Sequence, residues 1–311
     1  PAPRPRPAPP PPAAAPVADQ GTMTASTAAE SEDTGTGDEP TEDAAAAKAQ
    51  QAGAPETPAP VESPQDPAAR AASTPEAQPA PALEPEKPRH YKVSLPPSAE
   101  LAMTVARREA DGTERNGSGA QTWQTDGHGY KVSVEVGISL LVTRLNLLVT
   151  NSEGSVDDFG LAPVTYTEKR VNRAMTATHF RRADGKISFS TNEGSFDLLP
   201  GAQDFASLPF QLAAIGRGDP AQLTGTIDIQ VADSRDASVY RFEVVGQEPL
   251  ETPLGTLKTV HLSRPPRPGS YSSKLDVWLA PDRGWYPVQV RNTEGSGAVT
   301  TQSVSRIDAK E

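Results

Sequence analysis

The chain has 311 residues, a formal net charge of −11, no cysteine and 33 prolines. Twenty of those prolines fall in the first 90 positions, where no aromatic residue occurs. Such a segment cannot bury enough apolar surface to offset its ordering entropy, so we expect residues 1–90 to form a disordered, acidic Pro/Ala-rich spacer. Residues 91–311 hold all sixteen aromatic residues, and we expect them to fold as one β-rich domain.

The charge divides into −8 over residues 1–90 and −3 over residues 91–311. No segment carries the sustained basic charge that nucleic-acid binding requires, so we expect no nucleic-acid partner. The absence of cysteine excludes disulfides, thiolate catalysis and cysteine-based zinc or iron–sulfur sites. No apolar run reaches the length of a transmembrane helix.

The printed chain begins at Pro1 rather than Met, inside a Pro-rich run. We therefore expect that an N-terminal signal or membrane segment is missing from it. A spacer of this kind lets a domain work away from a fixed anchor, since it reaches roughly 280 Å when fully extended. The expected location is the periplasm, with any membrane association made through the missing segment alone.

Apolar and polar residues alternate along much of residues 91–311, which predicts half-buried strands. Tyr130, Val132, Val134 and Val136 share one predicted core face. Further predicted core faces are Leu145/Leu147/Val149, Ile227/Ile229/Val231, Tyr240/Phe242/Val244, Leu275/Val277/Leu279 and Tyr286/Val288/Val290. Short turns such as Asp126-Gly127 indicate antiparallel pairing. The expected fold is mainly β, with eleven to thirteen strands in a strongly curved antiparallel sheet or an open half-barrel.

One short helix is predicted over residues 208–215. Ser207 is a suitable N-cap, Pro209 lies in the first turn, and Gly216 is a suitable end. So short a helix needs tertiary support, and we expect it to act as a plug or lid over one face of the sheet.

Five short segments combine turn residues with core residues of predicted strands. They are residues 160–163 (GLAP), 203–204 (QD), 252–255 (TPLG), 276–282 (DVWLAPD) and 286–288 (YPV). Through them, residues 98–306 resemble the family catalogued as domain of unknown function 3108. The resemblance implies an exported, β-rich protein of the Gram-negative cell envelope. It implies no catalytic residues, because no activity is established for that family. The expected architecture is also similar to the curved half-barrels of periplasmic lipoprotein carriers, which is an analogy of fold.

Chemical motifs are scarce. None of His90, His128, His179 and His261 has a partner at metal-ligand spacing, so we interpret them as solvated or sheet-face residues and expect no metal or cofactor. No nucleophile elbow or phosphate-binding loop is present. Three acidic residues at polar strand positions could converge as a hydrolytic carboxylate pair, namely Asp228, Glu243 and Asp276.

Apolar residues also occur on the strand faces predicted to be polar. A sheet with apolar side chains on both faces must have both faces shielded from water. Two interpretations remain open: the helix covers the second face, or an apolar groove stays open for a ligand. The candidate ligand-binding residues are Trp123, Leu148, Val245, Val260, Leu262, Trp278, Trp285 and Tyr286.

The sequence therefore favours a non-enzymatic binding or interaction module of the cell envelope. Its expected partner is an apolar, lipid-like ligand or an apolar segment of an envelope protein, held in the concave face of the sheet. One alternative is a structural envelope protein that recruits a partner at a sheet edge. A second is a carbohydrate-active hydrolase.

Overall fold

A computed structural model describes residues 89–139, 144–266 and 272–310, and the predicted spacer lies outside them up to residue 88. The described part contains fifteen strands in one sheet and a single α-helix. Two 3₁₀ turns, η1 (Pro220–Gln222) and η2 (Pro281–Arg283), complete it. The strands and the helix are β1 (Ala99–Arg108), β2 (Glu114–Thr125), β3 (Gly129–Ser139), β4 (Arg144–Asp157), β5 (Gly160–Arg170), β6 (Thr176–Arg181), β7 (Lys186–Phe189), β8 (Ser195–Asp197), β9 (Gln203–Asp204), α1 (Leu208–Gly218), β10 (Thr226–Ala232), β11 (Ala237–Thr252), β12 (Gly255–Arg264), β13 (Lys274–Leu279), β14 (Pro287–Thr293) and β15 (Val299–Ala309).

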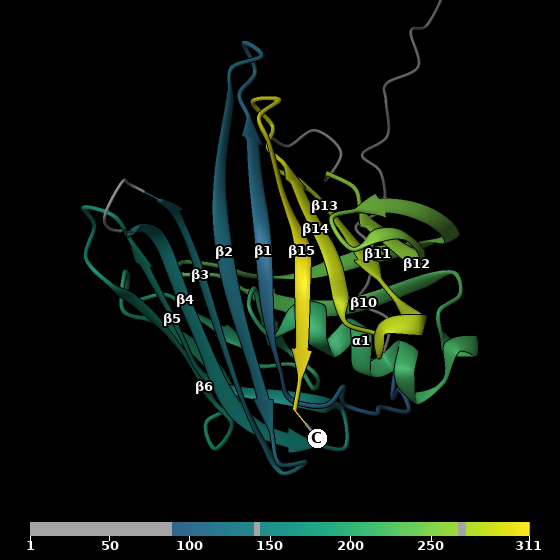
Figure 1. The fold of residues 1–311 in the computed structure, drawn as a ribbon. Coiled ribbons are helices and arrows are strands. Elements are labelled where there is room, and N and C mark those ends of the chain that lie inside the picture. Colours follow the sequence, from purple (N-terminus) through teal and green to yellow (C-terminus); the bar gives the residue numbers. More distant parts are fainter. Residues whose placement is uncertain (1–88, 140–143, 267–271, 311) are drawn as a thin grey trace, which may run out of the picture. The chain divides into compact units, whose positions relative to one another are not determined.

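The sheet is a curved, almost wholly antiparallel meander that does not close. Its order is β8-β7-β6-β5-β4-β3-β2-β1-β15-β14-β13-β12-β11-β10-β9. Among the described strands, only the β9–β10 pair is parallel. The two ends approach each other, because the Thr178 hydroxyl of β6 donates to the Asp233 carbonyl beyond β10 at 2.6 Å. The prediction of a mainly β, strongly curved open sheet with one helix is confirmed (Figure 1). The predicted number of strands was too low, since β8 and β9 are too short to show alternation.

Helix α1 lies within the curve of the sheet and packs against both halves of it. Phe210 belongs to a buried cluster with residues of β1, β2 and β3, and its ring stacks on Trp123 with centroids 4.5 Å apart. Leu212 and Ile215 belong to a second cluster, formed with residues of β10–β13. The helix therefore fills the concavity of the sheet, as the plug that the sequence predicted.

The helix begins as predicted but ends later. Ser207 is the N-cap, yet the helix continues through Gly216 to Gly218. Gly216 is required by close packing instead of by a helix end, since a Cβ there would lie 2.5 Å from the ring of Trp285. Gly218 is similar, because its Cβ would lie 2.2 Å from the carbonyl oxygen of Lys92.

The buried face of β4 also differs from the prediction. Thr150 and Ser152 are buried opposite Val134 and Val132, and Leu148 lies on their side, opposite Val136. Leu148 therefore belongs to the core face instead of the polar one. The predicted core face of this strand, Leu145/Leu147/Val149, was wrong because the buried side of β4 is partly polar. A register shift after Val136 then changes the alternation toward the start of the strand.

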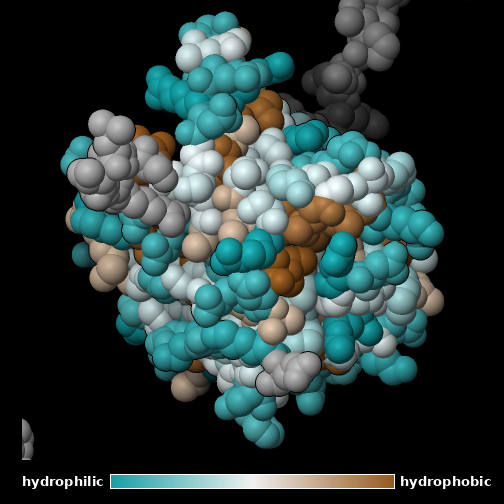
Figure 2. Space-filling view, in the orientation of Figure 1, coloured by the Kyte–Doolittle hydropathy of each residue, from teal (hydrophilic) through white to brown (hydrophobic). Residues whose placement is uncertain are grey.

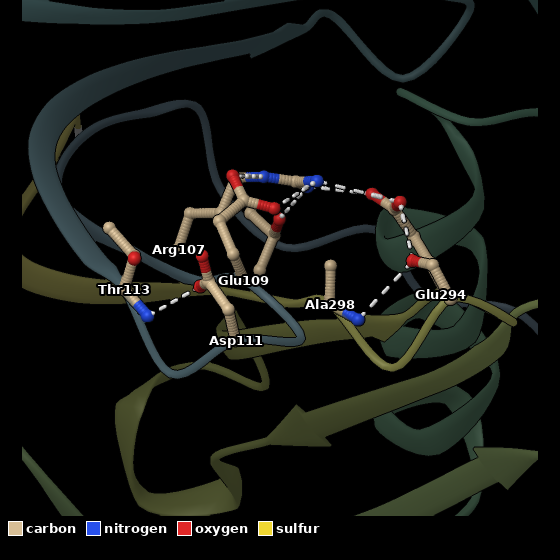
Figure 3. Close-up of polar contacts among 8 residues, drawn as sticks. Arg107, Glu109, Asp111, Thr113, Glu294 and Ala298 are labelled. Carbon is tan, nitrogen blue, oxygen red and sulfur yellow. Dashed lines mark hydrogen bonds and ion pairs between the residues drawn. The ribbon is translucent and has the colours of Figure 1, made fainter.

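The long β1–β2 and β14–β15 hairpins are joined near their turns by Arg107. Its guanidinium is 2.8 Å from Glu109 Oε1 and 2.6 Å from Glu294 Oε1, so it links the two hairpins (Figure 3). Hydrogen bonding to Arg107 lowers the pKa of Glu294. These side chains are about one-third exposed, so solvent screens the attraction and we assign the bridge a positional role.

Candidate binding groove

The eight predicted ligand-binding residues do not form one surface. Val260 and Leu262 are buried against α1, and Trp278 is buried on the opposite face of the same strands. Val245 lies at a register shift in β11 and is 57% exposed. Leu148, on the core face of β4, is half-buried, as is Trp285 against the helix.

Trp123 and Tyr286 come together beneath the segment that leads into β1. Trp123 Nε1 donates to the carbonyl of Pro96 at 3.0 Å, and the hydroxyl of Tyr286 donates to the carbonyl of Pro97 at 2.7 Å. Both side chains are buried. They are core residues that fix the backbone of residues 91–98, which we call the strap.

The strap is also bound to the C-terminal half of α1 and to the following 3₁₀ turn, η1. The amide of Ser94 donates to the carbonyl of Ala214 at 2.9 Å. The Gln222 side chain accepts from the amide of Lys92 at 2.7 Å and donates to its carbonyl at 2.9 Å. This pairing satisfies backbone groups of the strap with partners outside the sheet.

An open groove of about 1230 Å³ lies between the strap and the adjoining ends of β2–β5. Its apolar lining includes Leu95, Pro96, Pro97, Val156 and Val164. Val164 is 49% exposed because the β4–β5 register shifts between Glu153 and Gly154. The strands approach closely at that shift, since a Cβ on Gly154 would lie 2.2 Å from the carbonyl oxygen of Ala162.

Charged residues surround this apolar lining. Lys131 Nζ pairs with Glu153 at 3.1 Å, and both side chains are more than half exposed. Hydrogen bonds from the amides of Gly129 and His128 lower the pKa of Asp126. The groove thus has an apolar floor and a hydrated, charged border, an arrangement that suits an amphipathic ligand.

The residues that line this groove do not follow from the sequence pattern. Leu95, Pro96 and Pro97 precede the first strand and show no alternation, and the exposure of Val164 depends on a register shift. The available signal was indirect. Trp123 and Tyr286 were selected as aromatic residues with a polar atom, and both use that atom to hold the strap.

Two of the three carboxylates considered for hydrolysis, Asp228 and Asp276, are engaged in other interactions. Asp228 accepts two hydrogen bonds from the guanidinium of Arg241, at 2.8 and 2.5 Å. The Asp276 side chain is only 3% exposed. Burial raises its pKa, but hydrogen bonds from Ser263, His261 and Lys274 outweigh that effect and leave the pKa below its ordinary value. A low pKa is the opposite of what a general acid needs.

His261 and Trp278 form a polar cluster on the sheet face opposite Leu262. Their rings stack with centroids 4.3 Å apart, and His261 Nε2 lies 2.9 Å from Asp276 Oδ1. His261 Nδ1 is 3.2 Å from Glu248 Oε1 without hydrogen-bond geometry. The described residues contain no group of three or more histidines and carboxylates placed to hold a metal ion. On the face drawn in Figure 2, hydrophobic side chains gather over β14 and β15 amid a mostly hydrophilic surface.

Two of the sequence segments singled out above bind one another. Gln203 Nε2 donates to the carbonyl of Leu161 at 2.6 Å, while Gln211 accepts from the amide of Leu161 at 2.8 Å. Gly160 has a φ of 105°, and a Cβ there would lie 2.4 Å from Gln211 Oε1. The 160–163 and 203–204 segments therefore attach the start of β5 to the helix.

Asp204 is a buried carboxyl group at the N-terminal side of α1. Its Oδ1 accepts from the amides of Ala206 and Ser207, and its Oδ2 accepts from the hydroxyl of Ser152 at 2.6 Å. Burial raises its pKa to about 6 against these opposing hydrogen bonds. The group orients the first turn of the helix and is inaccessible to a ligand.

These features define a class of protein: an open, curved β-sheet wrapped around one helix, with an apolar groove at one end. The chain belongs to the family described as "Protein of unknown function (DUF3108)", whose model matches residues 102–303. This confirms the resemblance noted in the sequence. No curated protein matches the chain. Across the described residues, no helix is both long and apolar enough to cross a bilayer.

Two solved structures share remote similarity with the chain. A DUF1329 family protein from Desulfovibrio piger is 10% identical with a TM-score of 0.28, over 69% of this chain and 86% of the other. Lipoprotein LppX from Mycobacterium tuberculosis is 12% identical with a TM-score of 0.21, over 68% and 88%. Similarity this low supports no statement about ligand or activity.

Proposed function

We propose that the domain is a non-enzymatic binding module of the cell envelope that holds an apolar, lipid-like ligand in the groove beside the strap. The groove is the observation that carries the proposal. Its apolar floor, which includes Val156 and the half-exposed Val164, lies open to water. A ligand that covers this floor gains the free energy of removing both apolar surfaces from water.

The concave face itself offers less room than the sequence-based expectation required. Helix α1 occupies it, and residues 208–216 are all buried. The proposed ligand therefore lies at the end of the curved sheet instead of inside it. The charged border formed by Lys131 and Glu153 leaves a polar headgroup in water while the apolar part lies on the floor.

The proposed location is the periplasm, with the domain tethered by its N-terminal spacer. Membership of the family supports this part of the proposal, together with the composition of residues 1–90. Fractionation of cells that express the protein from its own gene should find the domain in the periplasmic or membrane fraction. Recovery from the cytoplasm would contradict the location without affecting the groove.

Ligand binding is tested with the 311-residue chain and a fluorescent fatty-acid probe. Val164→Glu should weaken binding about tenfold or more, because it buries a charge against the apolar part of the probe. Val245→Glu is the matched control, since Val245 is also an exposed valine at a register shift but lies outside the groove. Equal binding by Val164→Glu and the unmodified chain would overturn the proposal, as would a loss confined to Val245→Glu.

Recruitment of a partner at a sheet edge receives less support from the geometry. The two described edge strands, β8 and β9, are three and two residues long. Such short edges offer few free backbone groups for strand addition.

A further inference from the structure

A cluster of exposed apolar and basic side chains lies at the end of β4 and β5 far from the groove. Three of the seven large hydrophobic side chains that are exposed in the described part lie here: Leu145 at 40%, Val171 at 38% and Met175 at 63%. The amide of Val171 donates to the carbonyl of Leu147 at 2.9 Å, which joins the two strand ends. We call this region the rim, and it includes Lys169, Arg170 and Arg173.

Positive charge dominates the rim. Arg170 is the one rim arginine paired with a carboxylate, Glu168, at 2.6 Å. In the part of the chain that the structure describes, Arg173 forms no ion pair, and neither does the nearby Arg235. Arginines without a carboxylate partner beside exposed apolar side chains are a combination typical of surfaces that contact anionic lipid.

A crevice of about 510 Å³ connects the rim with the β10–β11 turn. Arg170, Arg173 and Arg235 line it, together with Glu168 and Asp233. Asp233 already accepts from the amides of Arg235 and Asp236 through Oδ1. Arg170 and Glu168 pair with each other, and the charge of Asp233 offsets one of the two remaining arginines. The lining of the crevice therefore keeps an excess of one positive charge.

The far wall of the crevice is held in place by hydrogen bonds. The hydroxyls of Thr178 and Thr191 donate to the carbonyls of Asp233 and Ser234, at 2.6 and 2.5 Å. Asn192 Nδ2 donates to the carbonyl of Arg235 at 3.3 Å. The backbone that carries Arg235 is thus fixed opposite the rim, so the arginines surround a preformed space.

We propose that the rim is a docking surface for an anionic phospholipid bilayer. The crevice arginines bind lipid phosphates, for which the guanidinium group supplies several donors in a plane. Met175, Val171 and Leu145 enter the boundary between headgroups and acyl chains, where a flexible thioether adapts to irregular packing. The rim lies at the opposite ends of β4 and β5 from Val156 and Val164, so this inference does not depend on the groove.

The test uses the 311-residue chain and flotation with two kinds of vesicle. Vesicles of equal parts phosphatidylcholine and phosphatidylglycerol should bind the chain, and vesicles of phosphatidylcholine alone should bind it weakly. Added salt should reduce the binding. Arg173→Gln and Arg235→Gln should each weaken it about fivefold. Met175→Gln should also weaken it about fivefold, because it removes apolar contact with the lipid.

Matched controls separate the rim from general charge or hydrophobicity. Arg306→Gln removes an exposed arginine on β15, and Val245→Gln removes an exposed valine on β11. Neither control should change vesicle binding by more than about twofold. The proposal is overturned by an absence of binding to the anionic vesicles, or by equal losses in the rim variants and the controls. A third result would also overturn it: the chain binds inorganic phosphate through Arg173 and Arg235, and Met175→Gln leaves vesicle binding unchanged. The crevice would then be a site for a soluble anion instead of a lipid bilayer.

Discussion

Gly216 lies against the indole ring of Trp285, so closely that a Cβ atom at position 216 would be 2.5 Å from the ring carbon Cζ3. Trp285 adopts a left-handed φ of 68°, which is uncommon for a residue with a large side chain. The contact joins the helix to the turn before β14. Both residues are therefore constrained by one another.

Gly216→Ala should lower the free energy of unfolding by about 1–3 kcal/mol, because the added methyl group overlaps the ring. The direction of the change is informative, because Gly→Ala in a helix without such a contact raises the free energy of unfolding by about 1 kcal/mol. Urea unfolding followed by circular dichroism measures the difference. A double variant with Trp285→Phe should recover part of the loss, and a stabilising effect of Gly216→Ala would contradict the packing described here.

The sequence predicted the parts of the fold that depend on local alternation. Tyr130, Val132 and Val134 are all buried on one face of β3, as their spacing requires. The assignment failed on β4, where Thr150 and Ser152 are buried. Ser152 can be buried there because its hydroxyl donates a hydrogen bond to Asp204, which lies on a segment distant in the sequence. The alternation of apolar and polar residues along β4 does not reveal that partner.

The candidate site could be predicted only in part. The amphipathic rings of Trp123 and Tyr286 hydrogen-bond the carbonyls of Pro96 and Pro97 in the strap, but neither residue lines the groove itself. The groove itself depends on a register shift beside Val164 and on the path of the strap, and neither follows from composition or spacing. Such features arise from tertiary pairing, which sequence patterns do not encode locally.

Asp204→Asn should remove a pH dependence of stability. Burial raises the pKa of Asp204 to about 6, so the folded state keeps its proton where the unfolded chain releases it. The free energy of unfolding of the unmodified chain therefore falls, relative to the variant, as the pH rises from about 4 to about 6. The difference between the unfolded pKa of about 4 and the folded pKa of about 6 corresponds to about 3 kcal/mol in the free energy of unfolding. Parallel stability curves for the two proteins in urea unfolding would refute this.

Asp276→Asn should show the opposite dependence. Burial raises the pKa of Asp276, but hydrogen bonds from Ser263, His261 and Lys274 outweigh burial and lower it. The ionised carboxylate therefore stabilises the fold above the unfolded pKa of about 4, and this stabilisation is lost in more acidic solution. At neutral pH the variant should be less stable by about 3 kcal/mol, because a buried pair loses one partner. The deficit should shrink below about pH 4, whereas a deficit independent of pH would indicate a packing effect instead.

Tyr286→Phe should loosen the strap without unfolding the domain. The variant loses the hydrogen bond to the Pro97 carbonyl, which is worth about 1 kcal/mol, while the ring remains buried. Hydrogen exchange of the Ser94 amide, which is bonded to Ala214, should accelerate about fivefold. Tyr166→Phe is the control, since its hydroxyl bonds Glu168 away from the strap. If both variants change the hydrogen-exchange rate of the Ser94 amide equally, Tyr286 acts through the overall stability of the domain and does not hold the strap that lines the groove.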